Sequence, residues 1–108
     1  MRLSESESHA IIESLKRFVP TEFKGHLLLF GSRTLDQAKG GDIDLALIGD
    51  LDLQILELKK VDYKIVAAMK VHKSIGDRKI DFKILNRADS QSAFFQHALK
   101  NAKLLFTW

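Results

Sequence analysis

The sequence predicts an α/β (α+β) fold in which a mixed sheet of about four strands carries flanking helices. Short apolar runs of strand length alternate along the chain with longer segments whose apolar residues recur at helical spacing. The chain has 108 residues, of which 45% are hydrophobic and 29% are charged. This is enough for one hydrophobic core and too little for two. We therefore expect a single domain over residues 1–108.

Helices are expected where apolar side chains return every three or four residues. The first follows the capping-box pattern Ser4-x-x-Glu7 and ends before Pro20. The second is expected over residues 52–73 and the last over residues 90–102. Each has an apolar face suited to packing against a sheet.

Strands are expected in four apolar runs. Residues 26–30 (HLLLF) and 42–48 are typical of strands buried on both faces. Residues 79–85 (KIDFKIL) alternate between polar and apolar side chains, and residues 104–106 (LLF) indicate a closing strand. The polar interval 32–41 is expected to hold a short helix and a loop.

Three aspartates lie on these predicted strands. Asp42 and Asp44 are two positions apart, so both carboxylates project from the same face of one strand. Two like charges held side by side repel each other unless a cation lies between them. Mg²⁺ prefers such oxygen ligands. Asp81 supplies a third carboxylate from another strand, and three acids on adjacent strands can surround a two-metal centre.

Gly31, Ser32 and Arg33 stand where the first strand ends and a helix is expected to begin. Glycine lets the backbone approach an anion closely, and free N–H groups at a helix N-terminus favour negative charge. The Ser32 hydroxyl can donate a further hydrogen bond, and the Arg33 guanidinium pairs well with phosphate. These three residues are therefore candidate nucleotide-binding residues.

The combined segment LLLFGSRTLDQAKGGDIDLALIG resembles the Gly-Ser … Asp-x-Asp motif of the polymerase-β-like nucleotidyltransferase superfamily. Within it, the chain is most similar to the minimal nucleotidyltransferases (MNT) that are paired with HEPN-domain proteins. HAIIESLKRFVP, KIDFK and FFQHALKNAKLLF match as well, so the resemblance covers nearly the whole chain. It implies a polymerase-β-like core, Mg²⁺ or Mn²⁺ held by Asp42, Asp44 and Asp81, and ATP or another NTP bound at Gly31 and Ser32.

The resemblance also implies a reaction, the transfer of a nucleoside monophosphate, first of all AMP from ATP, to an acceptor hydroxyl. Asp81 would be the third metal ligand or the base for that hydroxyl. The acceptor would be a HEPN-domain protein or another protein encoded nearby. The chain would then be the antitoxin of a toxin–antitoxin pair, working as a homo- or hetero-oligomer.

The chain departs from the family pattern between Ser32 and Asp42. The interval has nine residues here, fewer than the family commonly has. Asp36 replaces a frequent glycine, and Gly41 replaces the serine that usually precedes the first aspartate. An acid at position 36 would repel a triphosphate if it faced the site.

Two other function classes stay open. The same fold can act as a binding module that masks a partner protein with little or no catalysis. The five lysines between Lys59 and Lys73 form either a solvated helix face or a nucleic-acid contact, and the net charge is +3. Lys79 and Lys83 share the face of Asp81, where they either neutralise substrate phosphate or form ordinary ion pairs.

The composition excludes some kinds of site. The chain has no cysteine, so it forms neither disulfides nor thiolate metal sites. No segment reaches the roughly 18 apolar residues of a membrane span, and the N-terminal residues do not resemble a signal peptide. We therefore expect a cytoplasmic protein without a membrane partner.

Overall fold

The computed structural model of the chain describes residues 3–30, 42–92, 96–97, 100 and 102–108. The helices and strands of these residues follow one another along the chain as α1 (Glu5–Lys16), β1 (Gly25–Leu29), β2 (Ile43–Gly49), α2 (Asp52–Lys60), α3 (Asp62–Lys70), β3 (Ile80–Asn86), α4 (Arg87–Ser90) and β4 (Lys103–Thr107).

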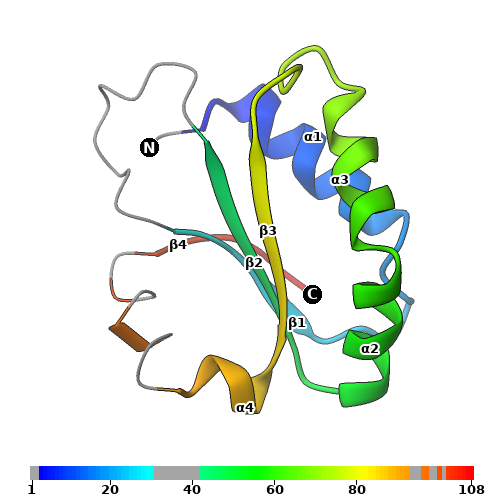
Figure 1. Cartoon of the computed structure of the whole chain (residues 1–108), viewed down its shortest axis with the longest axis vertical. Coiled ribbons are helices and arrows are strands. Elements are labelled where there is room, and N and C mark those ends of the chain that lie inside the picture. Colours follow the sequence, from blue (N-terminus) through cyan, green and yellow to red (C-terminus); the bar gives the residue numbers. More distant parts are fainter. Residues whose placement is uncertain (1–2, 31–41, 93–95, 98–99, 101) are drawn as a thin grey trace.

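The strands form one mixed sheet in the order β3–β2–β1–β4 (Figure 1). β1 is antiparallel to β2 and to β4, whereas β2 is parallel to β3. Two parallel neighbours need a crossover connection, which α2 and α3 supply. The predicted fold class, a mixed sheet with flanking helices, is confirmed.

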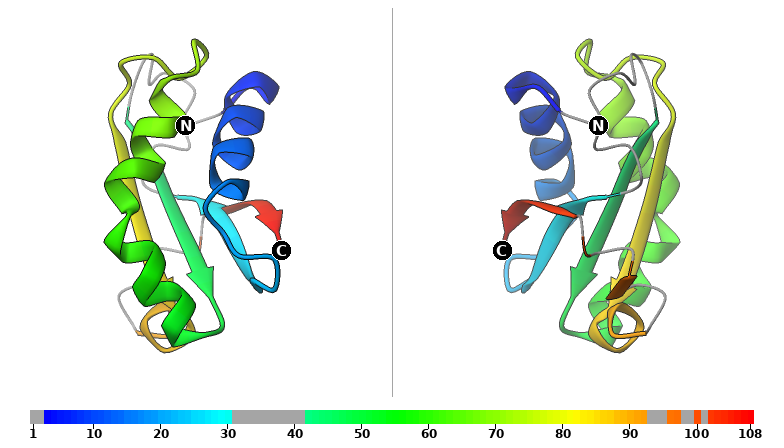
Figure 2. Two further views of the ribbon diagram at one scale, coloured as in Figure 1. Left: turned by 90° about the vertical axis from the view of Figure 1, so that its right-hand side faces the viewer. Right: turned by 90° about the vertical axis from the view of Figure 1, so that its left-hand side faces the viewer.

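Helices α1, α2 and α3 all lie on one face of the sheet (Figure 2). The main hydrophobic core fills the space between these helices and the strands. Its fully buried side chains include Leu15 of α1, Leu45 and Leu47 of β2, and Ile65 and Met69 of α3. The amphipathic helices therefore bury their apolar faces against the sheet.

The opposite face of the sheet carries a smaller apolar cluster. Ala46, Ile48 and Leu85 are its buried members. Because successive side chains of a strand point to opposite faces, Asp44 shares this face with Ala46 and Ile48, and Asp81 shares it with Leu85. The two acids therefore project away from the three helices.

Helix α1 begins at the predicted capping box. The Ser4 hydroxyl accepts a hydrogen bond from the Glu7 N–H (3.1 Å), and the Ser4 N–H donates to Glu7 Oε1 (2.8 Å). These two bonds satisfy backbone donors that a helix start leaves without partners. The helix ends at Lys16, before Pro20, as expected.

The prediction of a single helix over residues 52–73 is wrong. The helix breaks at Val61, whose backbone dihedrals (φ −119°, ψ 18°) lie outside the helical region. The residues buried on either side, Leu58 and Ile65, remain at the spacing of one continuous helix. The hydrophobic period therefore could not reveal the break.

The C-terminal segment differs in part from its prediction. A short helix, α4, precedes residue 91, and its start is capped by Asn86, whose side chain accepts from the Asp89 N–H (2.7 Å). Much of the predicted helix 90–102 lies outside the described residues, as does the whole interval 32–41. The closing strand is present as β4. No helix in the described ranges is long and apolar enough to cross a membrane.

Candidate active site

Asp44 and Asp81 are direct partners across the parallel pair β2 and β3. Neighbouring strands lie roughly 4.8 Å apart, and partner residues project from the same face. The two carboxylates therefore start side by side, on the sheet face that the helices leave open. This is the strand adjacency that a three-acid arrangement requires.

Asp42 comes one residue before β2, two positions ahead of Asp44. The neighbouring Ile43 N–H donates to the Lys79 carbonyl oxygen (2.9 Å), which ties the start of β2 to the start of β3. Asp42 and Asp44 are half-buried, and Asp81 is exposed. Within the described part of the chain, no three His, Cys, Asp or Glu side chains converge as a metal-binding group. The structure thus pairs Asp44 with Asp81, and Asp42 lies two positions before Asp44 along the chain.

Carboxylate oxygens are hard ligands, and the donor set of these aspartates fits a divalent cation such as Mg²⁺. Like charges directly opposite one another on adjacent strands lower stability. A cation between Asp44 and Asp81 would offset that repulsion. The chemistry of the pair therefore suits the metal that the resemblance implies.

Lys83 is the basic neighbour of the acid pair. Its Nζ lies 3.5 Å from Asp81 Oδ1, and the two side chains are 39% and 50% exposed. An ion pair this exposed contributes little to stability. Of the two interpretations that the sequence leaves open for Lys83, the ordinary ion pair is the one present here.

The carboxyl end of β1 lies next to β2, on the side of β2 that is opposite β3. The Phe30 N–H donates to the Asp44 carbonyl oxygen (3.0 Å), so Phe30 lies next to β2. Gly31, Ser32 and Arg33 lie outside the described residues. Because these residues follow Phe30 directly in the sequence, Phe30 connects the candidate phosphate-binding residues to the strand that carries Asp44.

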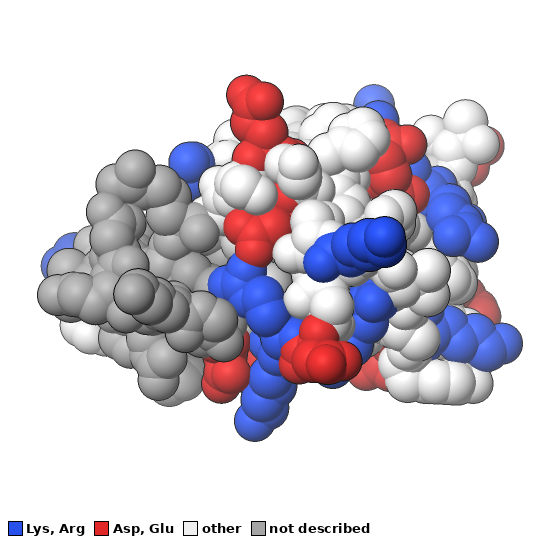
Figure 3. Space-filling view, turned by 90° about the horizontal axis from the view of Figure 1, so that it is seen from above, with Lys and Arg blue, Asp and Glu red and all other residues white. Residues whose placement is uncertain are grey.

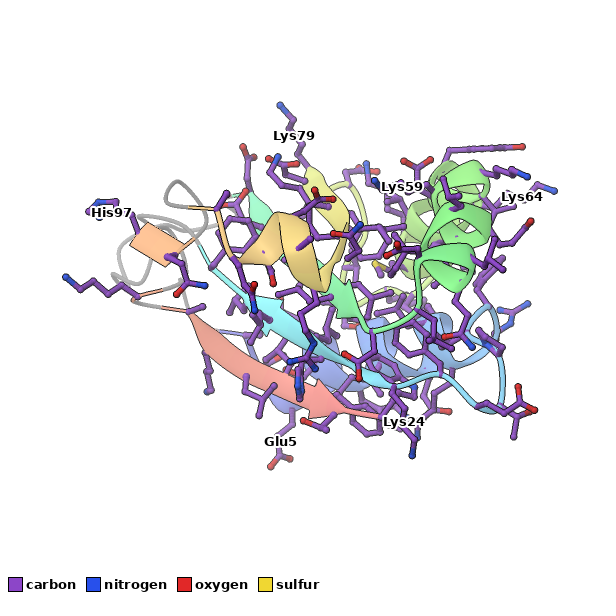
Figure 4. All side chains as sticks on the ribbon, turned by 90° about the horizontal axis from the view of Figure 1, so that it is seen from below. Glu5, Lys24, Lys59, Lys64, Lys79 and His97 are labelled. Atoms are coloured by element: carbon purple, nitrogen blue, oxygen red, sulfur yellow. The ribbon has the colours of Figure 1, made fainter. Side chains whose placement is uncertain are left out.

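Charges of both signs mix at the end of the molecule where β2 and β3 begin (Figure 3). Lys79 points away from the body of the molecule beside β3, while Lys59 and Lys64 project from α2 and α3 (Figure 4). The lysines at positions 59, 60, 64, 70 and 73 are all exposed, and Lys60 pairs with Glu57 (3.4 Å). These features are typical of a solvated helix face.

Two features next to the site were not predicted. Glu7 of α1 forms an ion pair with Arg78, just before β3, and both side chains are largely buried, at 15% and 18% exposed. Burial lowers the pKa of the Arg78 guanidinium below its usual value. The second feature is a cleft between α3 and β3 whose lining includes Tyr63 and Asp81. The ion pair could not be predicted from the sequence, because Glu7 and Arg78 are 71 positions apart and no sequence pattern joins them.

The architecture defines a class of protein: an α/β core in which helices cover one face of a mixed sheet and paired carboxylates occupy the other. The family described as "Polymerase beta, Nucleotidyltransferase" matches residues 11–107. The chain therefore belongs to the polymerase-β nucleotidyltransferase family, which confirms the predicted fold and superfamily.

One curated relative is Protein THEMIS3 of Mus musculus. It is 29% identical to this chain over 89 residues, which are 81% of this chain and 16% of that protein. The chain thus spans a small part of the length of this relative.

Proposed function

We propose that this chain is a divalent-metal-dependent nucleotidyltransferase that moves a nucleoside monophosphate, AMP from ATP in the first instance, to an acceptor hydroxyl. The observation that carries the proposal is the pairing of Asp44 with Asp81 across β2 and β3 in a chain of the polymerase-β family. The position of Phe30 beside Asp44 supports it, because the Gly31-Ser32 segment follows at once.

Each candidate residue has a distinct task in this proposal. Asp42, Asp44 and Asp81 would hold Mg²⁺ or Mn²⁺, and the ion would offset the charge of the triphosphate. Gly31, Ser32 and Arg33 would bind the phosphates through backbone N–H groups, a hydroxyl and a guanidinium, by the chemistry that favours anions there.

The transfer step needs a proton acceptor. The acceptor oxygen forms a bond to the α-phosphorus, the bond from that phosphorus to the bridging oxygen breaks, and pyrophosphate leaves with the electron pair. Asp81, the most exposed of the three acids, would be either the third metal ligand or the base that takes the proton of the acceptor hydroxyl.

The acceptor in this proposal is another protein. The resemblance to minimal nucleotidyltransferases points to a HEPN-domain protein encoded nearby. Both proteins would work in the cytoplasm, and this chain, a single domain, would be the antitoxin. The partner would present the hydroxyl to the open face of the sheet.

The test is label transfer from ATP labelled at the α-phosphate. The wild-type chain, Mg²⁺ and the protein encoded next to it should yield a labelled partner, and the Asp42→Ala/Asp44→Ala double variant should yield none. If the wild-type chain transfers no label to the partner, to itself or to small hydroxyl acceptors, the enzymatic proposal fails.

A second candidate function is a binding module that masks its partner without catalysis. The observation that favours it is apolar surface on and beside α2, where Leu51, Leu53 and Leu56 are 54%, 78% and 54% exposed. Beside them lies a groove of about 380 Å³ whose lining includes Phe18 and Val61. If the double aspartate variant still neutralises the HEPN partner, masking alone is sufficient.

A further inference from the structure

β3 is the edge strand of the sheet, and its pairing with β2 fixes which of its backbone groups face outward. The Ile43 N–H donates to the Lys79 carbonyl oxygen, so the backbone C=O group of Lys79 faces β2. In a parallel ladder this direction alternates along the strand. The residues whose N–H and C=O groups face the open edge are therefore Ile80, Phe82 and Ile84. Among the strands of the described ranges, none pairs with that edge.

A cleft of about 380 Å³ lies along the same edge, between β3 and α3. Tyr63 of α3 is 65% exposed and forms part of its wall. Four of the six residues that line the cleft are aromatic or aliphatic, and the other two are aspartates. The lining residues are Asp62, Tyr63, Val66, Ile80, Asp81 and Phe82.

The cleft lies on the helix side of the β3 edge, and Asp81 borders it from the side of the open face. Phe82 points to the helix side, since it packs against the main core, and Asp81 points to the open face. Side chains of any strand added to this edge would alternate in the same way. One side chain would enter the cleft beside Tyr63, and the next would stand beside Asp81.

We propose that the outer edge of β3 is the docking site of the acceptor, which binds as an extended peptide segment. The segment adds a strand to the sheet through the backbone groups of Ile80, Phe82 and Ile84. An apolar or aromatic side chain fills the cleft, and an adjacent serine, threonine or tyrosine carries the hydroxyl beside Asp81. The transfer itself rests on the proposed nucleotidyltransferase function, whereas the docking does not.

Charge favours a peptide over a nucleic acid at this edge. Asp62 and Asp81 border the cleft, and Lys83 is already paired with Asp81. The carboxylates would repel a phosphate backbone and attract a basic side chain. The peptide that fits best therefore has a basic residue close to its apolar anchor.

The test uses end-blocked, fluorescein-labelled hexapeptides in which a central Tyr, Ser or Thr follows Leu or Phe and is flanked by Arg. Fluorescence anisotropy with the full chain, without nucleotide, should show saturable binding. N-methylation of alternate peptide amides should abolish it in one of the two alternation frames, because it removes the donors to the β3 carbonyl oxygens. The other frame serves as the matched chemical control.

Protein variants test the cleft separately. Tyr63→Ala should weaken peptide binding about tenfold, the usual loss at an aromatic anchor. Val71→Ala, at the far end of α3 and 83% exposed, should leave binding unchanged. Circular dichroism of both variants should match that of the wild-type chain, so that a loss of binding is not a loss of fold.

Several results would overturn the docking proposal: no binding by any peptide of the set, equal binding in both N-methylated frames, or full binding by Tyr63→Ala. If sedimentation analysis shows a dimer that the Tyr63→Ala substitution dissociates, the edge binds a second copy of the chain instead. Displacement of the peptide by single-stranded RNA would assign it to nucleic acid. Peptide binding without label transfer would contradict the nucleotidyltransferase proposal and leave the docking proposal supported.

Discussion

Asp44 and Asp81 occupy opposed positions on two parallel strands, where like charges usually lower stability by a few tenths to about 1 kcal/mol. Lys83 offsets part of this repulsion from the same face. Residues that lower stability in this way are common at functional sites, since the substrate or a metal ion restores the balance. At the scale of single residues, the acid pair is therefore the place where the proposed cation would bind.

Asp81→Asn should lower nucleotidyl transfer strongly while changing the stability of the fold only slightly. The Asp81 side chain is 50% exposed and its ion pair is weak, so the free energy of unfolding should change by less than about 1 kcal/mol. Label transfer from ATP should fall by at least about 100-fold, because an amide neither accepts a proton nor binds a divalent ion as a carboxylate does. Urea unfolding and a transfer assay on the same sample measure both. Unchanged transfer would remove Asp81 from the site.

Lys83→Gln distinguishes an ion pair from a phosphate-binding lysine. Since Lys83 pairs with Asp81, we expect the KM for ATP to stay within about twofold and the stability loss to remain under about 1 kcal/mol. Steady-state kinetics over a range of ATP concentrations provides the measurement. A KM that rises tenfold or more with little change in kcat would show that the lysine binds phosphate.

At the scale of elements, the start of α1 does two things at once. Glu7 completes the capping box with Ser4 and also forms the largely buried ion pair with Arg78, next to the strand that carries Asp81. This joins the first helix to the start of β3. The ion pair therefore helps position the edge strand that carries Asp81.

Two variants separate the cap from the ion pair. Ser4→Ala should cost about 1 kcal/mol, the usual value for a helix cap. Glu7→Gln keeps an oxygen that accepts from the Ser4 N–H, but it should cost about 1–3 kcal/mol because it weakens the charge-assisted bond of a buried guanidinium. Thermal unfolding of both variants at one pH gives the comparison. A Glu7→Gln variant as stable as the wild-type chain would mean that the Arg78 ion pair adds nothing to stability.

The glycines at the far end of the sheet permit the close packing of β1 and β2. Gly25 and Gly49 are register partners, and a Cβ at Gly25 would lie 2.2 Å from the Ile48 carbonyl oxygen and 2.7 Å from the Phe23 ring. Phe23 in turn packs edge-on against Trp108. β1 must therefore carry glycine where it enters the sheet.

Gly25→Ala should destabilise the chain by about 1–3 kcal/mol, as overpacking of a well-filled core does. Denaturant unfolding monitored by Trp108 fluorescence would report both the loss and any movement of the aromatic pair. Ala88→Ser, at an exposed position of α4, is the control and should change stability by less than about 0.5 kcal/mol. An alanine at position 25 that leaves stability unchanged would contradict the packing described for this end of the sheet.

The sequence reveals some elements and conceals others for physical reasons. Apolar runs and the capping box depend on neighbouring residues, so β1, β2, β3 and the start of α1 follow from local pattern. The break at Val61 does not, because the buried positions keep one helical phase across it. The partnership of Asp44 with Asp81 depends on strand order, which only the folded sheet defines.

At the scale of the whole molecule, the two faces of the sheet have different tasks. Three helices and the main core cover one face and supply stability (Figure 2), while the other face carries Asp44 and Asp81. Such a division lets the site change without disturbing the core. It also leaves the edge of β3 beside the acids for a partner.

Isothermal titration calorimetry of ATP, with and without Mg²⁺, tests the central claim that the acid pair serves a metal-bound nucleotide. The wild-type chain should bind ATP with measurable heat when Mg²⁺ is present and at least about tenfold more weakly in its absence. The Asp42→Ala/Asp44→Ala variant, folded as judged by circular dichroism, should lose this metal-dependent binding. No heat for the wild-type chain under either condition, or equal binding by the double variant, would contradict the claim.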